Sequence, residues 1–157
     1  AASGGGLAVG SIKINNSTPG GGITVDTSRI QLVSTSIVPG VGTGGKFDLF
    51  TTGAINLSTG QIVVDAPAGD GNITMKGGSL AVTGVGPPLL QANGSTKAGK
   101  IIITTTAGSL TFGTSGNALM ASATGGTGEG GTINVSASNA LTINNAATAL
   151  NVTGLIR

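Results

Sequence analysis

Hydrophobic and polar residues alternate in short segments along most of this chain. The clearest stretch spans residues 125–152 and contains three such segments, Ile-Asn-Val at 133–135, Leu-Thr-Ile at 141–143 and Leu-Asn-Val at 150–152. Alternation turns the apolar side chains of a segment to one side and the polar side chain to the other, as in a half-buried strand. Small and Asn-rich residues separate the segments and suit sharp turns. The stretch therefore predicts three short strands that form one coil of a solenoid.

The same three-strand pattern recurs from residue 22 onward and predicts five coils. The apolar pairs predicted to open the coils are Ile23/Val25, Phe47/Leu49, Ile73/Met75, Ile101/Ile103 and Ile133/Val135. Second strands are predicted at Ile30/Leu32, Ile55/Leu57, Leu80/Val82, Leu110/Phe112 and Leu141/Ile143, and third strands at Ile37, Ile62/Val64, Leu89/Leu90, Leu119/Ala121 and Leu150/Val152. The repeat length varies from about 24 to about 32 residues, which is typical of solenoid proteins. Glycine-rich segments before the first strands absorb most of this variation.

Coils of this kind stack into three parallel sheets with strands about 4.8 Å apart. We therefore predict an all-β chain, a right-handed parallel β-helix of about five coils with little or no helix. Residues 22–157 form the solenoid in this prediction. Residues 1–21 form an irregular N-terminal arm or partial coil, with a strand at residues 12–14. The predicted interior contains aligned columns such as Ile23, Phe47, Ile73, Ile101 and Ile133.

The composition supports a narrow aliphatic interior. The 157 residues include 30 glycines and three phenylalanines, but no tryptophan, tyrosine, histidine or cysteine. A conventional globular core of this size uses several large aromatic side chains. The formal charge is only +2, and the basic residues are scattered along the sequence, which argues against a nucleic-acid partner. No apolar run reaches the roughly 18 residues of a membrane-spanning segment.

Two glycine-rich loops, at residues 40–45 and 126–131, match the G-x-G-x-x-G pattern of dinucleotide-binding sites. Such a site requires a loop that leads from a strand into a helix, whose N-terminus receives the pyrophosphate. Here Phe-Asp-Leu and Thr-Ile-Asn-Val follow the loops, and both segments are predicted strands. We interpret the glycines as corner residues and predict no cofactor.

The distribution of acids argues against an enzyme. The acidic residues are Asp26, Asp48, Asp65, Asp70 and Glu129. In the predicted alignment Asp26 shares a column with Phe50, and Asp48 shares one with Thr24, so no two acids stack as a catalytic pair. Gly-Asp-Gly-Asn at 69–72 is a single fragment of a calcium-binding nonapeptide repeat, and ordinary turn use is favoured over a metal site.

The repeat resembles those of a known family. Its pattern is a Gly-rich corner, then Gly-Gly-Thr-Ile-Asn-Val, Ala-Leu-Thr-Ile and Asn-Asn-Ala-Ala, and it matches best over residues 113–152. It is similar to the repeats of filamentous-haemagglutinin-like exoproteins, which are right-handed parallel β-helices of bacterial surfaces, and especially to the glycine- and asparagine-rich versions in cyanobacteria. The resemblance implies secretion, fibre formation and adhesion. Since the family's N-terminal secretion domain is not in this sequence, an internal segment or a separate short protein is expected.

We therefore expect a structural subunit or repeat segment of an extracellular or cell-surface filament, which self-assembles head to tail through open solenoid ends and contributes to adhesion. The predicted assembly junctions are Ile12, Ile14, Leu150, Val152, Leu155 and Ile156. One alternative is a carbohydrate- or surface-binding adhesin module that contacts a surface polysaccharide through its glycine-rich corner loops. A less favoured alternative is an ice-binding solenoid, because outward-facing Thr24, Thr74, Thr111 and Thr142 are interrupted by other residues.

Overall fold

The computed structural model describes residues 10–25, 30–33, 44–58, 61–66, 71–83, 90–113, 119–123, 128–143 and 150–151. These residues form fifteen strands and no helix, so none of them lies in a helix that could cross a membrane. The first sheet contains β1 (Ser11–Asn16), β4 (Lys46–Thr51), β7 (Asn72–Gly77), β10 (Lys100–Thr105) and β13 (Thr132–Ser136). The second contains β2 (Ile23–Val25), β5 (Ala54–Leu57), β8 (Ser79–Val82), β11 (Leu110–Phe112) and β14 (Leu141–Ile143). The third contains β3 (Ile30–Gln31), β6 (Ile62–Val63), β9 (Leu90–Gln91), β12 (Leu119–Met120) and β15 (Leu150–Asn151).

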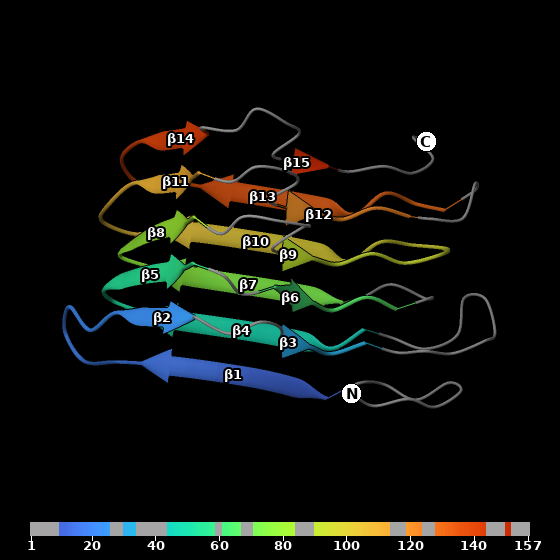
Figure 1. The fold of residues 1–157 in the computed structure, drawn as a ribbon, viewed down its shortest axis with the longest axis horizontal. Coiled ribbons are helices and arrows are strands. Elements are labelled where there is room, and N and C mark those ends of the chain that lie inside the picture. Colours follow the sequence, from blue (N-terminus) through green and yellow to red (C-terminus); the bar gives the residue numbers. More distant parts are fainter. Residues whose placement is uncertain are drawn as a thin grey trace.

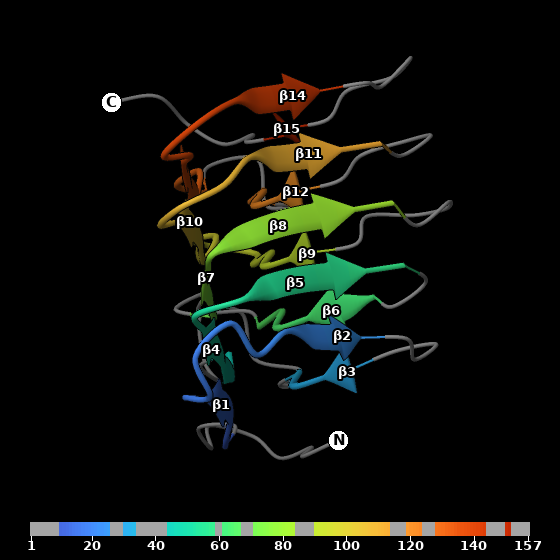
Figure 2. The same cartoon turned by 90° about the vertical axis from the view of Figure 1, so that its left-hand side faces the viewer.

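The strands form three parallel sheets that run along one axis. Successive strands of the chain enter the first, second and third sheet in turn, and every third strand pairs with its counterpart in the next coil. Figures 1 and 2 show five such coils stacked from β1, β2 and β3 at one end to β13, β14 and β15 at the other. The predicted all-β parallel solenoid of five coils is confirmed.

The register corrects the predicted first coil. β1 pairs with β4, which places Ile12, not Ile23, in the column of Phe47. Ile23 instead lies in the second sheet, where it pairs with Ile55. The strand predicted at residues 12–14 therefore opens the first coil of this solenoid.

The correction continues through the rest of that coil. Ile30, predicted in a second strand, lies in the third sheet beside Ile62, and Ile37, predicted in a third strand, lies outside the described residues. The next four coils follow the predicted alignment in the first and second sheets. In these two sheets the alignment was therefore wrong in the first coil only.

The core consists of the predicted aliphatic columns. In the first sheet the inward columns are Ile12, Phe47, Ile73, Ile101, Ile133 and Ile14, Leu49, Met75, Ile103, Val135. The members in the three middle coils are completely buried. The two end members of each column are only half-buried and pack against this core. In the first sheet, complete burial thus depends on having a coil on both sides.

A glycine precedes the first strand of every coil. The column contains Gly10, Gly45, Gly71, Gly99 and Gly131. A Cβ atom added to Gly99 would lie 2.1 Å from the carbonyl oxygen of Gly71, and one added to Gly131 would lie 2.4 Å from that of Gly99. At Gly10, in the first coil, such an atom would meet nothing within 4 Å. The backbones of successive coils approach too closely at this corner for a side chain.

Replacing Ile73 with alanine is expected to lower the free energy of unfolding by about 2–5 kcal/mol, because the side chain is fully buried between neighbouring coils. Leu141→Ala is the matched control. Leu141 lies in the last coil and is 49% exposed, so its loss should amount to about 1 kcal/mol or less. Urea unfolding followed by circular dichroism measures both changes. Equal losses would contradict the stacked-column account of stability.

Candidate functional site

The two end layers of the solenoid have strands that pair on one side only. β1, β2 and β3 end the three sheets at one end, and β13, β14 and β15 end them at the other. At the end formed by β1, β2 and β3, the lower end in Figure 1, the half-buried apolar side chains are Ile12, Ile14, Ile23, Ile30 and Leu32, whereas Val25 is buried. At the upper end Ile133 and Val135 are half-buried, and Leu141 is the most exposed large hydrophobic residue of the described part. Among the described residues each end therefore presents apolar side chains and strands that pair on one side only.

The predicted junction residues fall on these two ends where the structure describes them. Ile12 and Ile14 lie in β1, and Leu150 lies in β15, where it pairs with Leu119. Val152, Leu155 and Ile156 lie outside the described residues. Ile23 and Leu141 were not among the six residues predicted individually for the junctions. The repeat itself contained the signal, since both belong to terminal strands of the second sheet.

A series of backbone hydrogen bonds shows how one coil joins the next. In the first sheet, the first residue of each strand after β1 donates its N–H to the carbonyl of the glycine that precedes the corresponding strand of the previous coil. The bonds run from Lys46 to Gly10 (3.3 Å), Asn72 to Gly45 (3.0 Å), Lys100 to Gly71 (2.8 Å) and Thr132 to Gly99 (3.1 Å). Continuing the series requires the N–H of Ser11 at the lower end and the carbonyl of Gly131 at the upper end. Neither group has a backbone partner in the described part of the chain.

The described acids have separate structural partners. A carboxylate oxygen of Asp48 lies 3.3 Å from the ammonium nitrogen of Lys46. Asp65 accepts hydrogen bonds from the side chain of Gln91 and, at 2.6 Å, from the backbone N–H of Asn93. The corrected register places Asp48 beside Lys13 and Thr74, not beside Thr24.

The remaining acids belong to corner segments. Glu129 joins Thr96 and Ala98 by backbone hydrogen bonds of 2.9 Å. Asp26 and Asp70 lie outside the described residues, although the column of Phe50, assigned to Asp26 from the sequence, contains Asn15. Among the described residues no three acids gather at a possible metal site.

The glycine-rich loops and threonines also have structural roles. The described ends of both G-x-G-x-x-G loops, Gly44–Gly45 and 128–131, lead directly into β4 and β13. In the second sheet Thr24, Thr111 and Thr142 share a column with Asn56 and Ala81. The threonine column is therefore interrupted, as the sequence predicts.

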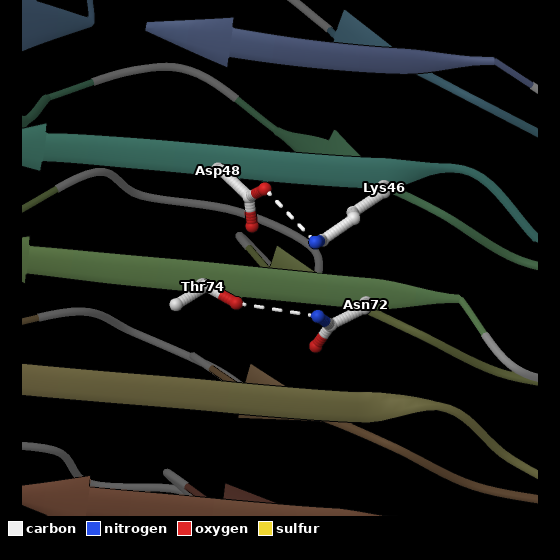
Figure 3. Close-up of polar contacts among 4 residues, drawn as sticks. All are labelled: Lys46, Asp48, Asn72 and Thr74. Atoms are coloured by element: carbon white, nitrogen blue, oxygen red, sulfur yellow. Dashed lines mark hydrogen bonds and ion pairs between the residues drawn. The ribbon is translucent and has the colours of Figure 1, made fainter. Parts of the chain in front are cut away.

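Lysines that are scattered in the sequence gather on the outer face of the first sheet. This lysine face carries Lys13, Lys46, Lys76 and Lys100 on four successive coils, together with one acid, Asp48. Figure 3 shows part of it, with the Lys46–Asp48 ion pair above the hydrogen bond of 3.3 Å from the Asn72 amide to the Thr74 hydroxyl. Lys46 is 57% exposed and Asp48 14%, so the positive charges are the more accessible ones.

A cavity of about 400 Å³ lies at one end of this face, where the strands leave the first sheet. Its lining includes Asn15, Ser17, Phe50, Thr52, Lys76 and Thr106. The hydroxyl of Thr52 accepts from the Gly20 N–H at 3.1 Å and donates to the Thr18 carbonyl at 2.8 Å, and Thr106 donates to the Gly77 carbonyl at 3.2 Å. These bonds between coils fix the threonine walls.

The apolar wall of the cavity is Phe50, a half-exposed side chain on β4. The ammonium nitrogen of Lys13 lies 5.9 Å from the centre of the Phe50 ring. The cavity thus combines an aromatic surface with two nearby ammonium groups, from Lys13 and Lys76. Sequence reasoning missed this arrangement, because Lys13, Phe50 and Lys76 come from three different coils. Comparison of the chain with protein-family models, curated proteins and solved structures found no match.

Proposed function

We propose that this chain is a structural segment of an extracellular bacterial filament, in which solenoids stack head to tail. The complementarity of the two end layers carries the proposal. The end strands correspond in length, with β13 and β1 of five and six residues, β14 and β2 of three each, and β15 and β3 of two each. The extracellular setting is proposed from the resemblance of the repeat to haemagglutinin-like exoproteins.

Extending the observed register across such a junction matches apolar with apolar positions. Ile133 of one copy would lie beneath Ile12 of the next, and Leu141 beneath Ile23, as in the columns within one chain. The outward positions would set Thr132, Asn134 and Ser136 against Ser11, Lys13 and Asn15, so no like charges meet. The Ser11 N–H would bond the Gly131 carbonyl and continue the series between coils.

Such a contact joins different surfaces of two identical chains. A contact of this kind does not close on itself and propagates into a filament. Each junction would bury half-exposed aliphatic side chains and pair strand edges that otherwise attract any other strand. The solenoid would then act as a length of rod, and its long sides would remain accessible.

Electron microscopy and sedimentation at increasing protein concentration test this proposal. We expect rods that lengthen with concentration and share the width of one solenoid. Gly10→Ala should shorten them, because the new methyl group would meet the Gly131 carbonyl of the copy below at the close distances seen for Gly99 and Gly131. It should leave the unfolding midpoint of the single chain unchanged, since a Cβ atom added at Gly10 would meet nothing within 4 Å. A chain that stays monomeric at every concentration would overturn the proposal.

A further inference from the structure

We infer that the lysine face and the adjoining cavity bind a linear acidic polysaccharide whose sugar units carry carboxylate groups. The face has four lysines and one aspartate, a formal charge of +3, whereas the whole chain has +2. The positive charge of the protein is thus concentrated on one long side. The core uses none of these lysines, and of the four only Lys13 lies in an end strand.

The arrangement of the lysines suits an extended polymer. Lys46 and Lys100 occupy one column two coils apart, a separation of about 10 Å at a coil spacing of about 4.8 Å. Lys13 and Lys76 lie two and four positions further along the strand, on the first and third coils. One sugar unit of an extended glycan is about as long as one coil spacing of about 4.8 Å. A polymer that runs along the axis can therefore place carboxylates two units apart at Lys46 and Lys100, whereas Lys13 and Lys76 lie to the side of this line and nearer the cavity.

The cavity supplies the contacts that a sugar ring requires. Phe50 offers an apolar surface to the C–H groups of a ring, while Asn15 and Ser17 offer an amide and a hydroxyl to its hydroxyl groups. Within the described part of the chain the side chains of Asn15, Ser17 and Lys76 make no hydrogen bond or ion pair. Because Thr52 and Thr106 are held by backbone contacts, the walls need no reordering when a ligand enters.

A nucleic acid fits this surface less well. Single strands bind through aromatic platforms for successive bases, and arginine is among the commonest readers of base edges in duplexes. The face has only one aromatic ring, Phe50, and no arginine among its residues. Carboxylated sugars need only hydroxyl partners, one apolar wall and spaced cations.

The test measures binding of the whole chain to polygalacturonate by affinity electrophoresis, at concentrations below those that give rods, with dextran and duplex DNA as further probes. We expect polygalacturonate to retard the chain at low salt, less retardation at high salt, and none from dextran. The double variant Lys76→Gln/Lys100→Gln should weaken the apparent affinity about ten-fold, at the upper end of the effect of two exposed ion pairs. Lys97→Gln, which removes a lysine outside this face, should change it less than about two-fold.

A second pair of variants tests the cavity itself. Asn15→Asp and Ser136→Asp add the same charge in the same outward column, but at opposite ends of the solenoid. Asn15→Asp should weaken binding several-fold more, since only Asn15 lines the cavity. Thermal unfolding checks that all variants remain folded. Equal effects of the two aspartates, a loss with Lys97→Gln as large as with the double variant, no retardation by polygalacturonate, or equally strong retardation by DNA would overturn the inference. Rod formation is measured separately by sedimentation, so the proposed polysaccharide binding and the proposed filament assembly can each fail without the other.

Discussion

Gly99→Ala is expected to lower the free energy of unfolding by about 3 kcal/mol or more, which is large for the replacement of one hydrogen atom by a methyl group. The new Cβ atom would lie 2.1 Å from the carbonyl oxygen of Gly71 and 3.1 Å from the side chain of Ala92. The oxygen cannot move away freely, because it accepts the Lys100 N–H at 2.8 Å. Relief of the clash would therefore break the hydrogen bond that joins two coils.

Gly10→Ala is the matched control for this effect. Both glycines precede the first strand of a coil, but only Gly99 has a coil beneath it in the described structure. At a concentration where the chain is monomeric, urea unfolding followed by circular dichroism should show a large loss for Gly99→Ala and none for Gly10→Ala. The constraint is space and not backbone conformation, since neither glycine has a positive φ. Similar midpoints for the two variants would contradict close coil contact at this corner.

The repeat could be predicted because its first-sheet strands are long enough for apolar and polar residues to alternate visibly. In the first sheet, inward residues such as Phe47 and Ile73 are fully buried and their outward neighbours are not. The third sheet was harder, because its strands have two residues and alternation fails there. Ile62, Val63 and Val64 are all buried. Only the recurrence of an apolar pair at the right distance indicated those strands.

The first coil was misaligned because its insertion lies in a different corner. Six residues separate β1 from β2, whereas two separate β4 from β5. An alignment that assigns variable length to the corner before the first strand therefore starts the coil at Ile23. The glycine required at each close contact between coils is a better signal in the sequence. Only glycine fits between stacked backbones, and Gly10 marks the start of β1 as Gly45 marks that of β4.

The lysine face could be recognised only once the register of the first-sheet strands was known. Lys13, Lys46, Lys76 and Lys100 are far apart in the sequence, and no local motif connects them. They meet because each occupies an odd position of its first-sheet strand, which turns outward, while the even positions turn inward. Since the predicted alignment left Lys13 outside the coils, sequence reasoning could not place it next to Phe50.

Leu141→Lys and Ile23→Lys are each expected to abolish rod formation. In the proposed junction Leu141 of one copy faces Ile23 of the next, so either substitution would bury an ammonium group against an aliphatic side chain. An unpaired buried charge costs several kcal/mol, which should weaken the contact by more than about 100-fold. Sedimentation should show single chains for each variant. Thr111→Lys adds the same charge to the outward side of the same sheet and should still form rods.

Mixing the two blocked variants gives the most specific result. Leu141→Lys retains an intact lower end, and Ile23→Lys retains an intact upper end, so an equimolar mixture should form dimers of one copy each and nothing longer. This outcome follows only from a contact between unlike ends. Dimers of either variant alone would indicate pairing of like ends instead. A mixture that stays monomeric, with both variants folded by circular dichroism, would show that the chains do not continue each other's sheets.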